Sequence, residues 1–253
     1  MLDIIPHGDI TELRLARPPV NALNLELLQT LHAAFDHAVA GGARGIVLSG
    51  QPGMFSAGVD VPTLLTLDHD GARGYWHEFF ATAAALACSP VPLVAAVTGH
   101  SPAGGAVLAL MCDHRVMADG AWKIGLNEVQ VGLTVPDCIQ LALRRAIGAR
   151  PAERLLIAGT MLDAQQALAC GYVDALAQPD DVIAHALQWM TDLLALPSRA
   201  MLATRRLARA DLVATFADVE ALPLDGFLTD YFAAETQTTL QALVARLKSK
   251  APR

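Results

Sequence analysis

The stretch from Pro90 to Gly132 reads PVPLVAAVTGHSPAGGAVLALMCDHRVMADGAWKIGLNEVQVG. Residues 93–98 are a short apolar, β-branched run between proline and glycine, which predicts a buried strand. Residues 99–105 contain three glycines and a proline, a composition typical of a tight turn. Residues 106–112 continue as an apolar run of good helix formers. A strand, a tight turn and a helix therefore follow one another directly.

The expected helix begins at a pair of glycines, Gly104 and Gly105, and this start has chemical consequences. The first N–H groups of a helix have no partner within the helix, and the helix dipole places positive potential at the same end. Such a turn suits a negative charge, or an oxygen that becomes negative during a reaction. Glu128 follows in an otherwise apolar and amide segment, GLNEVQVG. The stretch thus offers a backbone site for an anion and one carboxylate.

The segments around this stretch predict an α/β fold. Strands over 10–15, 45–49 and 115–118 alternate with helices, which favours a mostly parallel sheet covered by helices. Asn24 is a suitable N-cap for the first helix. After Pro136 no strand pattern is convincing, so that one α/β core with a helical extension is the economical interpretation. The expected helices are 25–40, 75–87, 139–147, 152–158, 164–169, 182–196, 198–210 and 232–248.

Composition and charge argue against several classes of partner. Apolar residues make up 53% of the 253-residue chain and the mean hydropathy is +0.38, which is ample for a core. No apolar run approaches the roughly 18 residues that a membrane span needs. A net charge of −7 disfavours a nucleic-acid partner. No histidine or cysteine cluster has metal-ligand spacing, so we expect no metal. The N-terminus lacks the basic and apolar regions of a targeting segment, from which we expect a cytoplasmic location.

One enzyme class competes for the central turn. Gly99-His100-Ser101-Pro102-Ala103 is similar to the G-x-S-x-G nucleophile elbow of serine hydrolases. In that elbow the residue after the serine donates its N–H to the oxyanion, and Pro102 has no N–H. A serine hydrolase that uses Ser101 therefore stays an alternative with half of its oxyanion hole missing. His100 is a secondary candidate beside the glycines.

Four motifs together resemble the crotonase (enoyl-CoA hydratase/isomerase) family. They are FSAGVD at 55–60, PAGGAVLALMCDHRVMAD at 102–119, IGLNEVQVGL at 124–133 and AERLLIAGTMLDAQQALACGYV at 152–173. The resemblance is greatest to the mitochondrial-type Δ3,Δ2-enoyl-CoA isomerase branch. It implies a crotonase (ClpP-like) fold of repeated ββα units, with a core domain over 1–195. It also implies a helical C-terminal trimerisation region over 196–253, and hence a homotrimer or a dimer of trimers.

The resemblance also implies a substrate and its binding groups. An acyl-CoA thioester would bind with its carbonyl oxygen between the N–H groups of Ala57 and Gly104, and coenzyme A would arrive as part of the substrate, with no further cofactor. Removal of a proton from carbon 2 puts negative charge on that oxygen, which two fixed N–H donors stabilise. The other positions that match the family's coenzyme A groove, or that we expect to hold its phosphates, are Asn21, Ala22, Leu23, Ser56, Asp60, Arg17, and Lys248 or Lys250 from a neighbouring subunit; for Asp60 a helix start is the alternative role.

The catalytic carboxylates decide which reaction is expected. In hydratases of this family two glutamates hold the attacking water; by motif, the first falls at Val107 here and the second at Glu128. Valine cannot orient or deprotonate water, and it adds an apolar wall to the substrate site. We therefore expect an isomerase in which Glu128 alone moves a proton from carbon 2 to carbon 4. The alternatives are hydration, thioester hydrolysis or decarboxylation on the same fold, a subunit that binds acyl-CoA without turnover, and a purely structural role for Glu128.

Overall fold

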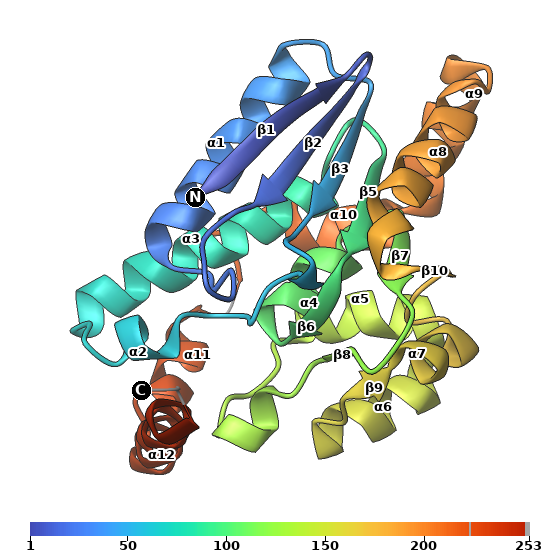
Figure 1. Cartoon of the computed structure of the whole chain (residues 1–253). Coiled ribbons are helices and arrows are strands. Elements are labelled where there is room, and N and C mark those ends of the chain that lie inside the picture. The colour runs from blue at the N-terminus through green and yellow to red at the C-terminus, as the bar shows by residue number, and fades with distance from the viewer. Residues whose placement is uncertain (223, 251–253) are drawn as a thin grey trace.

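A six-stranded sheet forms the centre of the chain, in the order β1-β2-β3-β5-β7-β10 (Figure 1). The structure is a computed structural model that describes residues 1–222 and 224–250, without the side chain of Lys250. All neighbouring strands are parallel except β1 and β2, which form an antiparallel hairpin. The expected mostly parallel α/β sheet is therefore confirmed. Its strands are β1 Leu2–His7, β2 Ile10–Leu15, β3 Gly45–Ser49, β5 Leu93–Val97, β7 His114–Ala118 and β10 Ala175–Ala177.

Side chains of the central strands alternate between the two faces of this sheet. In β5, Leu93, Ala95 and Val97 belong to the larger core, and Val94 and Ala96 belong to a smaller one. The larger core lies under helices α1 Leu25–Ala40, α3 His69–Ala87 and α4 Gly104–Leu110, and the smaller one lies under α8 Val182–Leu194. Asn24 caps α1 as expected, since its side chain accepts a hydrogen bond from the N–H of Leu27.

A second, smaller sheet lies below the first in Figure 1, with its strands in the order β4-β6-β8-β9. Strands β4 Gly53–Met54 and β6 Gly99–Pro102 come so close that a Cβ on Gly99 would lie 1.9 Å from the carbonyl carbon of Gly53. Only glycine fits at Gly99, and this contact fixes the loop before α4 against the loop after β4. The other two strands are β8 Lys123–Gly125 and β9 Leu162–Asp163.

Most of the remaining helices lie in the lower half or on the right side of the molecule in Figure 1, whereas α10 lies near its centre. Helix α10 packs on α3 and α5, α11 packs on α3, and α12 packs on α2 and on the short 3-10 helix η1. The expected helix over 198–210 is observed as α9, which ends two residues earlier at Ala208, whereas α10, which begins at Ala210, was not predicted. These elements are α2 Val61–Leu64, η1 Glu128–Val131, α5 Asp137–Ile147, α6 Ala149–Ala158, α7 Ala164–Cys170, η2 Pro179–Asp181, α9 Ser198–Ala208, α10 Ala210–Phe216, α11 Leu224–Tyr231 and α12 Ala234–Lys250.

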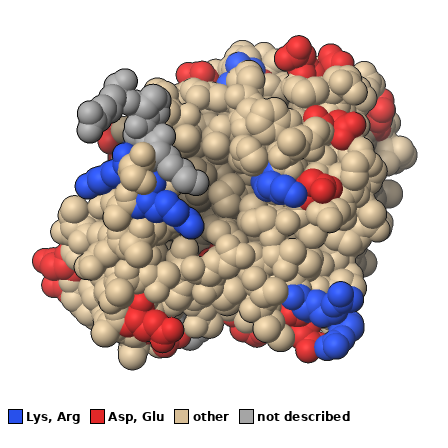
Figure 2. All heavy atoms as spheres, turned by 60° about the horizontal axis from the view of Figure 1, so that its bottom comes forward, with Lys and Arg blue, Asp and Glu red and all other residues tan. Residues whose placement is uncertain are grey.

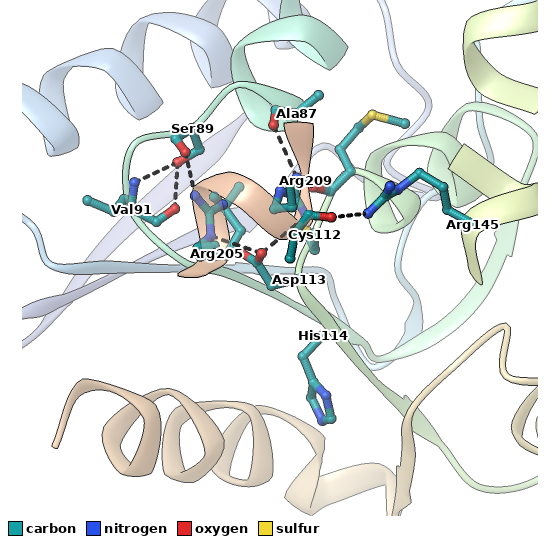
Figure 3. Close-up of polar contacts among 12 residues, drawn as sticks. Ala87, Ser89, Val91, Cys112, Asp113, His114, Arg145, Arg205 and Arg209 are labelled. Carbon is teal, nitrogen blue, oxygen red and sulfur yellow. Dashed lines mark hydrogen bonds and ion pairs between the residues drawn. The ribbon is translucent and has the colours of Figure 1, made fainter. Parts of the chain in front are cut away.

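Arg205 of α9 and Arg209, which lies between α9 and α10, attach these helices to the core through one largely buried carboxylate, that of Asp113 (Figure 3). Asp113 accepts hydrogen bonds from Arg205 Nε at 2.9 Å and lies 3.1 Å from Arg209 Nη1. Arg205 also donates to the carbonyl of Ser89, and Arg209 donates to the carbonyl of Met111. Since all three charged side chains are nearly buried, this cluster holds the C-terminal helices in place.

Several expectations about local structure are wrong or stay untested. Strands β9 and β10 lie beyond Pro136, where none was expected, and β1 and α11 were not predicted. Each of the two late strands has at most three residues and exists through pairing with β8 or β7. The boundary between a core over 1–195 and an oligomerisation region over 196–253 stays a prediction. Among the helices of the described chain, none is long and apolar enough to cross a membrane.

Candidate active site

A pocket of about 560 Å³ opens at the lower end of the fold, where the loop after β4, the start of α4 and η1 meet. Figure 2 brings this end forward and shows a hollow between mostly uncharged walls, with lysine and arginine side chains on its rim. Gly104, Val107 and Glu128, which come from the central sequence stretch, all line the pocket. The apolar walls come from α3, α11 and α12, with side chains that include Trp76, Phe79, Phe80, Phe227, Leu243 and Leu247.

The N–H of Ala57, expected as an oxyanion donor, is already used. It donates to the carbonyl of Val20 at 2.9 Å, so the expectation for Ala57 is wrong in this structure. Two residues further on, Val59 pairs with Leu23: the carbonyl of Gly58 accepts from Leu23 and the N–H of Asp60 donates to Leu23. In an extended segment, the N–H of a residue points away from the strand with which the preceding carbonyl and the following N–H are paired. Val59 N–H therefore faces away from Leu23, and within the described chain it has no acceptor.

The second donor is at the start of α4. Val59 N lies 3.4 Å from where a Cβ on Gly104 would sit, and Gly104 N lies 3.2 Å from the corresponding point on Gly58. The two backbone segments thus meet at one place on the pocket wall. Ala103, the residue before α4, has φ 46° and ψ −118°, which is costly for a residue with a Cβ, and its N–H bonds to the carbonyl of Gly125. This strained turn directs the first N–H groups of α4 towards the pocket.

Glu128 is the first residue of η1 and brings the carboxylate into the pocket. Its side-chain atom Oε2 is buried and has no hydrogen-bond partner in the described chain. Burial raises the pKa of Glu128 from 4.5 to about 7, and its own backbone N–H opposes this effect only in part. At neutral pH such a carboxyl group exists in both protonation states. It is therefore able to accept a proton and to return it.

The two other charged residues that line the pocket neutralise each other. Arg17 Nη2 lies 2.7 Å from Asp60 Oδ2, and Arg17 also donates to the carbonyl of Ala22. Asp60 in addition accepts from the N–H of Thr63 and caps α2. The helix-start interpretation of Asp60 is therefore confirmed, and Arg17 holds two loops together at the pocket edge. A role of Arg17 toward a phosphate stays a prediction.

Three residues expected in the substrate groove lie behind the pocket wall. Asn21 is fully buried, its side chain donates to the carbonyl of Phe55, and Ser56 donates to the carbonyl of Asn21 at 2.7 Å. Leu23 is buried as well, and its carbonyl accepts from Tyr75. These side chains brace the two loops and do not line the pocket, so that a contact of these positions with the substrate stays a prediction. Ala22 does line the pocket.

The C-terminal helix reaches the pocket of its own chain. Leu243 and Leu247 of α12 line the pocket, and Lys248, the next residue, is exposed. The expectation placed Lys248 at the pocket of a neighbouring subunit; the structure places its helix at the pocket of the same chain. The side chain of Lys250 lies outside the described residues. The apolar contribution of α11 and α12 could not be read from sequence motifs.

Ser101 lacks the surroundings of a catalytic nucleophile. Its hydroxyl is fully buried, has no partner in the part of the chain that the structure describes, and does not line the pocket. His100 beside it accepts a hydrogen bond from the N–H of Lys123 and packs edge-on against Trp122. Neither residue is placed for serine hydrolase chemistry. Within residues 1–222 and 224–250 no group of His, Cys, Asp and Glu is arranged to hold a metal ion. That catalysis needs no cofactor stays a prediction.

Comparison with known proteins identifies the family. A family model described as enoyl-CoA hydratase/isomerase matches residues 7–249. The chain belongs to the enoyl-CoA hydratase/isomerase family. Its structure is similar to the crystal structure of human mitochondrial delta3-delta2-enoyl-CoA isomerase, with a TM-score of 0.94, 30% identity and 99% of each chain covered. The chain is therefore an acyl-CoA enzyme with the crotonase fold, as the sequence motifs implied.

Relatives within the enoyl-CoA hydratase/isomerase family carry names for two activities. The human mitochondrial enoyl-CoA delta isomerase 1 is 32% identical over 244 residues, which cover 95% of this chain and 81% of that protein. A probable enoyl-CoA hydratase of Mycobacterium avium (strain 104) is 37% identical over 198 residues, which cover 76% of this chain and 75% of that protein. The isomerase relatives from human, mouse and rat are mitochondrial. They contradict the expected cytoplasmic location, which rested on the N-terminal residues of the given sequence alone.

Proposed function

We propose that this protein is a Δ3,Δ2-enoyl-CoA isomerase, which moves the double bond of an enoyl-CoA from carbon 3 to carbon 2. One observation carries the proposal. Among the described residues that line the pocket, Glu128 is the one carboxylate without an ion-pair partner. By the motif resemblance, Val107 stands where a hydratase of the family has its other glutamate. The similarity to mammalian enoyl-CoA delta isomerases over nearly the whole chain supports the same conclusion.

The proposed reaction needs one base and one oxyanion site. Glu128 takes a proton from carbon 2, and the electron pair of that C–H bond moves into the thioester, whose carbonyl oxygen becomes negative. The N–H groups of Val59 and Gly104 stabilise this oxygen, and the loss of one such donor typically costs a factor of 10²–10³ in rate. The protonated Glu128 then delivers the proton to carbon 4 while the double bond forms between carbons 2 and 3. The carbonyl is restored and Glu128 is a carboxylate again.

Water addition is disfavoured by the side chains around the base. Val107 is only 2% exposed and lies on α4, one turn after Gly104. An aliphatic side chain neither accepts a proton from water nor holds it for attack. The pocket walls from α3, α11 and α12 are apolar as well. The conjugated enoyl thioester that forms in this site therefore leaves without the addition of water to its carbon 3.

The proposal is tested with two substrates in parallel. The protein is given 3-trans-hexenoyl-CoA, and the absorbance of the conjugated enoyl thioester is followed as it appears; crotonyl-CoA is given separately, and the decay of the same absorbance reports hydration. We expect a rapid gain with the first substrate and little decay with the second. Decay with crotonyl-CoA that is faster than the gain with hexenoyl-CoA would instead assign the protein to the hydratases.

We further propose, from the family resemblance, that the protein is a homotrimer or a dimer of trimers. Exposed apolar side chains on α6 and α9, such as Ile157 at 74% and Leu207 at 73% exposure, are consistent with surfaces that an assembly covers. Sedimentation velocity of the purified protein measures the assembly directly. A monomer at micromolar concentration would contradict this part of the proposal.

A further inference from the structure

The loop that carries Glu128 closes on itself just behind the carboxylate. The carbonyl of Glu128 accepts a hydrogen bond from the N–H of Leu133 at 3.0 Å. Between them Gly132 adopts a left-handed conformation, with φ 78° and ψ 16°. The backbone from Glu128 to Leu133 is therefore one compact turn. A displacement of Gly132 would also displace Glu128.

The first turn of α12 rests directly on this turn. Thr236 Oγ1 donates a hydrogen bond to the carbonyl of Gly132 at 2.7 Å, and Thr236 is only 4% exposed. A Cβ on Gly132 would lie 3.0 Å from the Cα of Thr236, so that the two backbones are in contact. Gly132 is thus required twice, for its left-handed conformation and for the approach of α12.

The same face of α12 continues into the substrate pocket. Leu243 and Leu247 follow Thr236 by seven and eleven residues, a spacing that puts all three on one side of a helix, and both line the pocket. The start of α12 is itself fixed: Tyr231 donates to the carbonyl of Leu64, and Gln237 donates to the carbonyl of Tyr231. α12 therefore has a defined position against both the base and the pocket.

We propose that Thr236 is a positioning residue for Glu128, which holds the turn of residues 128–133 against α12 through its hydroxyl group. The proposal rests on the proposed function only in taking Glu128 as the base. Thr236 itself does not line the pocket, so it acts through Gly132 and not on the substrate. Without its hydroxyl group, the carbonyl of Gly132 loses this partner and the turn gains freedom to move.

A loosened turn has two measurable consequences. Water reaches the Glu128 carboxyl, so its pKa falls toward the ordinary value of 4.5. The carboxylate also leaves its position beside carbon 2 of the substrate, and small misplacements of a catalytic group cost up to about 10² in rate. Thr236→Val is therefore expected to lower kcat by roughly ten- to hundredfold, with KM little changed, and to move the acidic limb of the pH–rate profile to lower pH.

Two further variants separate the hydroxyl group from packing. Thr236→Ser keeps the donor and is expected to restore most of kcat and the pH profile. Thr238→Val makes the same chemical change on the exposed side of α12, where the threonine hydroxyl bonds only to the carbonyl of Ala234 in its own helix. We expect this control to behave like the wild type in both measurements. Circular dichroism and thermal unfolding verify that all three variants are folded.

A second measurement does not depend on isomerase activity. The pH dependence of stability that Glu128 confers is obtained by comparing each protein with the same protein carrying Glu128→Gln, first in the wild type and then with Thr236→Val. We expect the Glu128 contribution to shrink in the Thr236→Val background. If Glu128 contributes as much pH-dependent stability in the Thr236→Val background as in the wild type, the inference is overturned. An equal loss of kcat in Thr236→Val and Thr236→Ser would overturn it as well. An inactive wild type with the expected pH dependence would refute the proposed function and leave the role of Thr236 standing.

Discussion

From the burial of the Glu128 carboxyl group we predict how the free energy of unfolding depends on pH, independently of the substrate. Glu128→Gln replaces the carboxyl by an uncharged amide of nearly the same size. In the folded wild type the pKa of Glu128 is about 7, against 4.5 for an exposed glutamate. This difference corresponds to about 3 kcal/mol between the two protonation states. We expect that free energy to appear in the comparison of the two proteins as the pH is changed.

The sign follows from which state holds the proton. Below about pH 4.5 the carboxyl is protonated in both the folded and the unfolded chain, and it adds no pH dependence. From there to about pH 7 the unfolded chain has released its proton while the folded chain still holds it, so the free energy of unfolding of the wild type falls as the pH rises. Above that range the loss is complete. Glu128→Gln lacks this loss and becomes relatively more stable by about 3 kcal/mol at high pH.

Thermal or urea unfolding at several pH values measures the effect. The stability difference between Glu128→Gln and the wild type should grow by about 3 kcal/mol from about pH 4 to about pH 8, or by roughly 6–12 °C in Tm. Glu153→Gln is the control, because Glu153 is exposed on α6 and pairs with Arg150 at the surface. Its curve should run parallel to that of the wild type. A difference between Glu128→Gln and the wild type that stays constant over this range would refute the desolvation of Glu128.

The same variant tests the catalytic role of the carboxylate. Glu128→Gln should lower isomerase kcat by a factor on the order of 10³, since the amide cannot accept the proton from carbon 2. In the wild type kcat/KM should rise with pH through about 7, as Glu128 becomes deprotonated. A variant that keeps more than about a tenth of the wild-type rate would mean that another group is the base.

Three further predictions concern other positions. Val107→Glu should add measurable hydration of crotonyl-CoA and lower isomerase activity, because a second carboxylate beside Glu128 gives water a partner; an unchanged ratio of the two activities would contradict the role given to the valine. Asp113→Asn should cost about 3–5 kcal/mol in urea unfolding, because it leaves two nearly buried arginines without their counter-charge, whereas Asp9→Asn at an exposed pair should cost at most about 1 kcal/mol. Tyr172→Phe should leave Tm unchanged or raise it, since the buried Tyr172 hydroxyl has no partner within the described chain, and a fall of several degrees would reveal a hydrogen bond.

The parts of the fold that depend on local chemistry could be predicted from the sequence. Helix α1 begins and ends at the predicted residues because apolar spacing, the Asn24 cap and the following glycines all act within a few residues. Strand β5 is apolar throughout its buried length and lies between a proline and a glycine in the sequence, so it could be predicted as well. By contrast, the three residues of β10 have no pattern of their own and are ordered by pairing with β7. Non-local pairing of this kind has no signature in a short window of sequence.

The candidate site shows the same limit at the level of single atoms. Gly104 and Glu128 could be predicted, because a glycine pair before a helix and a single carboxylate in an apolar segment are features of the sequence itself. The sequence does not show whether Ala57 or Val59 is the second donor. That choice depends on whether the N–H of Ala57 already donates to the carbonyl of Val20. Asn21 illustrates the same limit: it matches a position of the family's coenzyme A groove, and the sequence does not show that its side chain donates to the carbonyl of Phe55 in the neighbouring loop.

The raised pKa of Glu128 and the proposed lack of water addition depend on one arrangement, the apolar wall to which the C-terminal helices contribute. A base that must both take and return a proton works best when its pKa lies near the ambient pH, because neither transfer is then strongly uphill. Here that pKa comes from burial, and α11 and α12 supply part of the wall through Phe227, Leu243 and Leu247. The same apolar side chains offer no hydrogen-bond partner to a water molecule next to them. A change in α12 that admits water should therefore lower the pKa of Glu128 and raise hydration together, whereas separate causes would let the two vary independently.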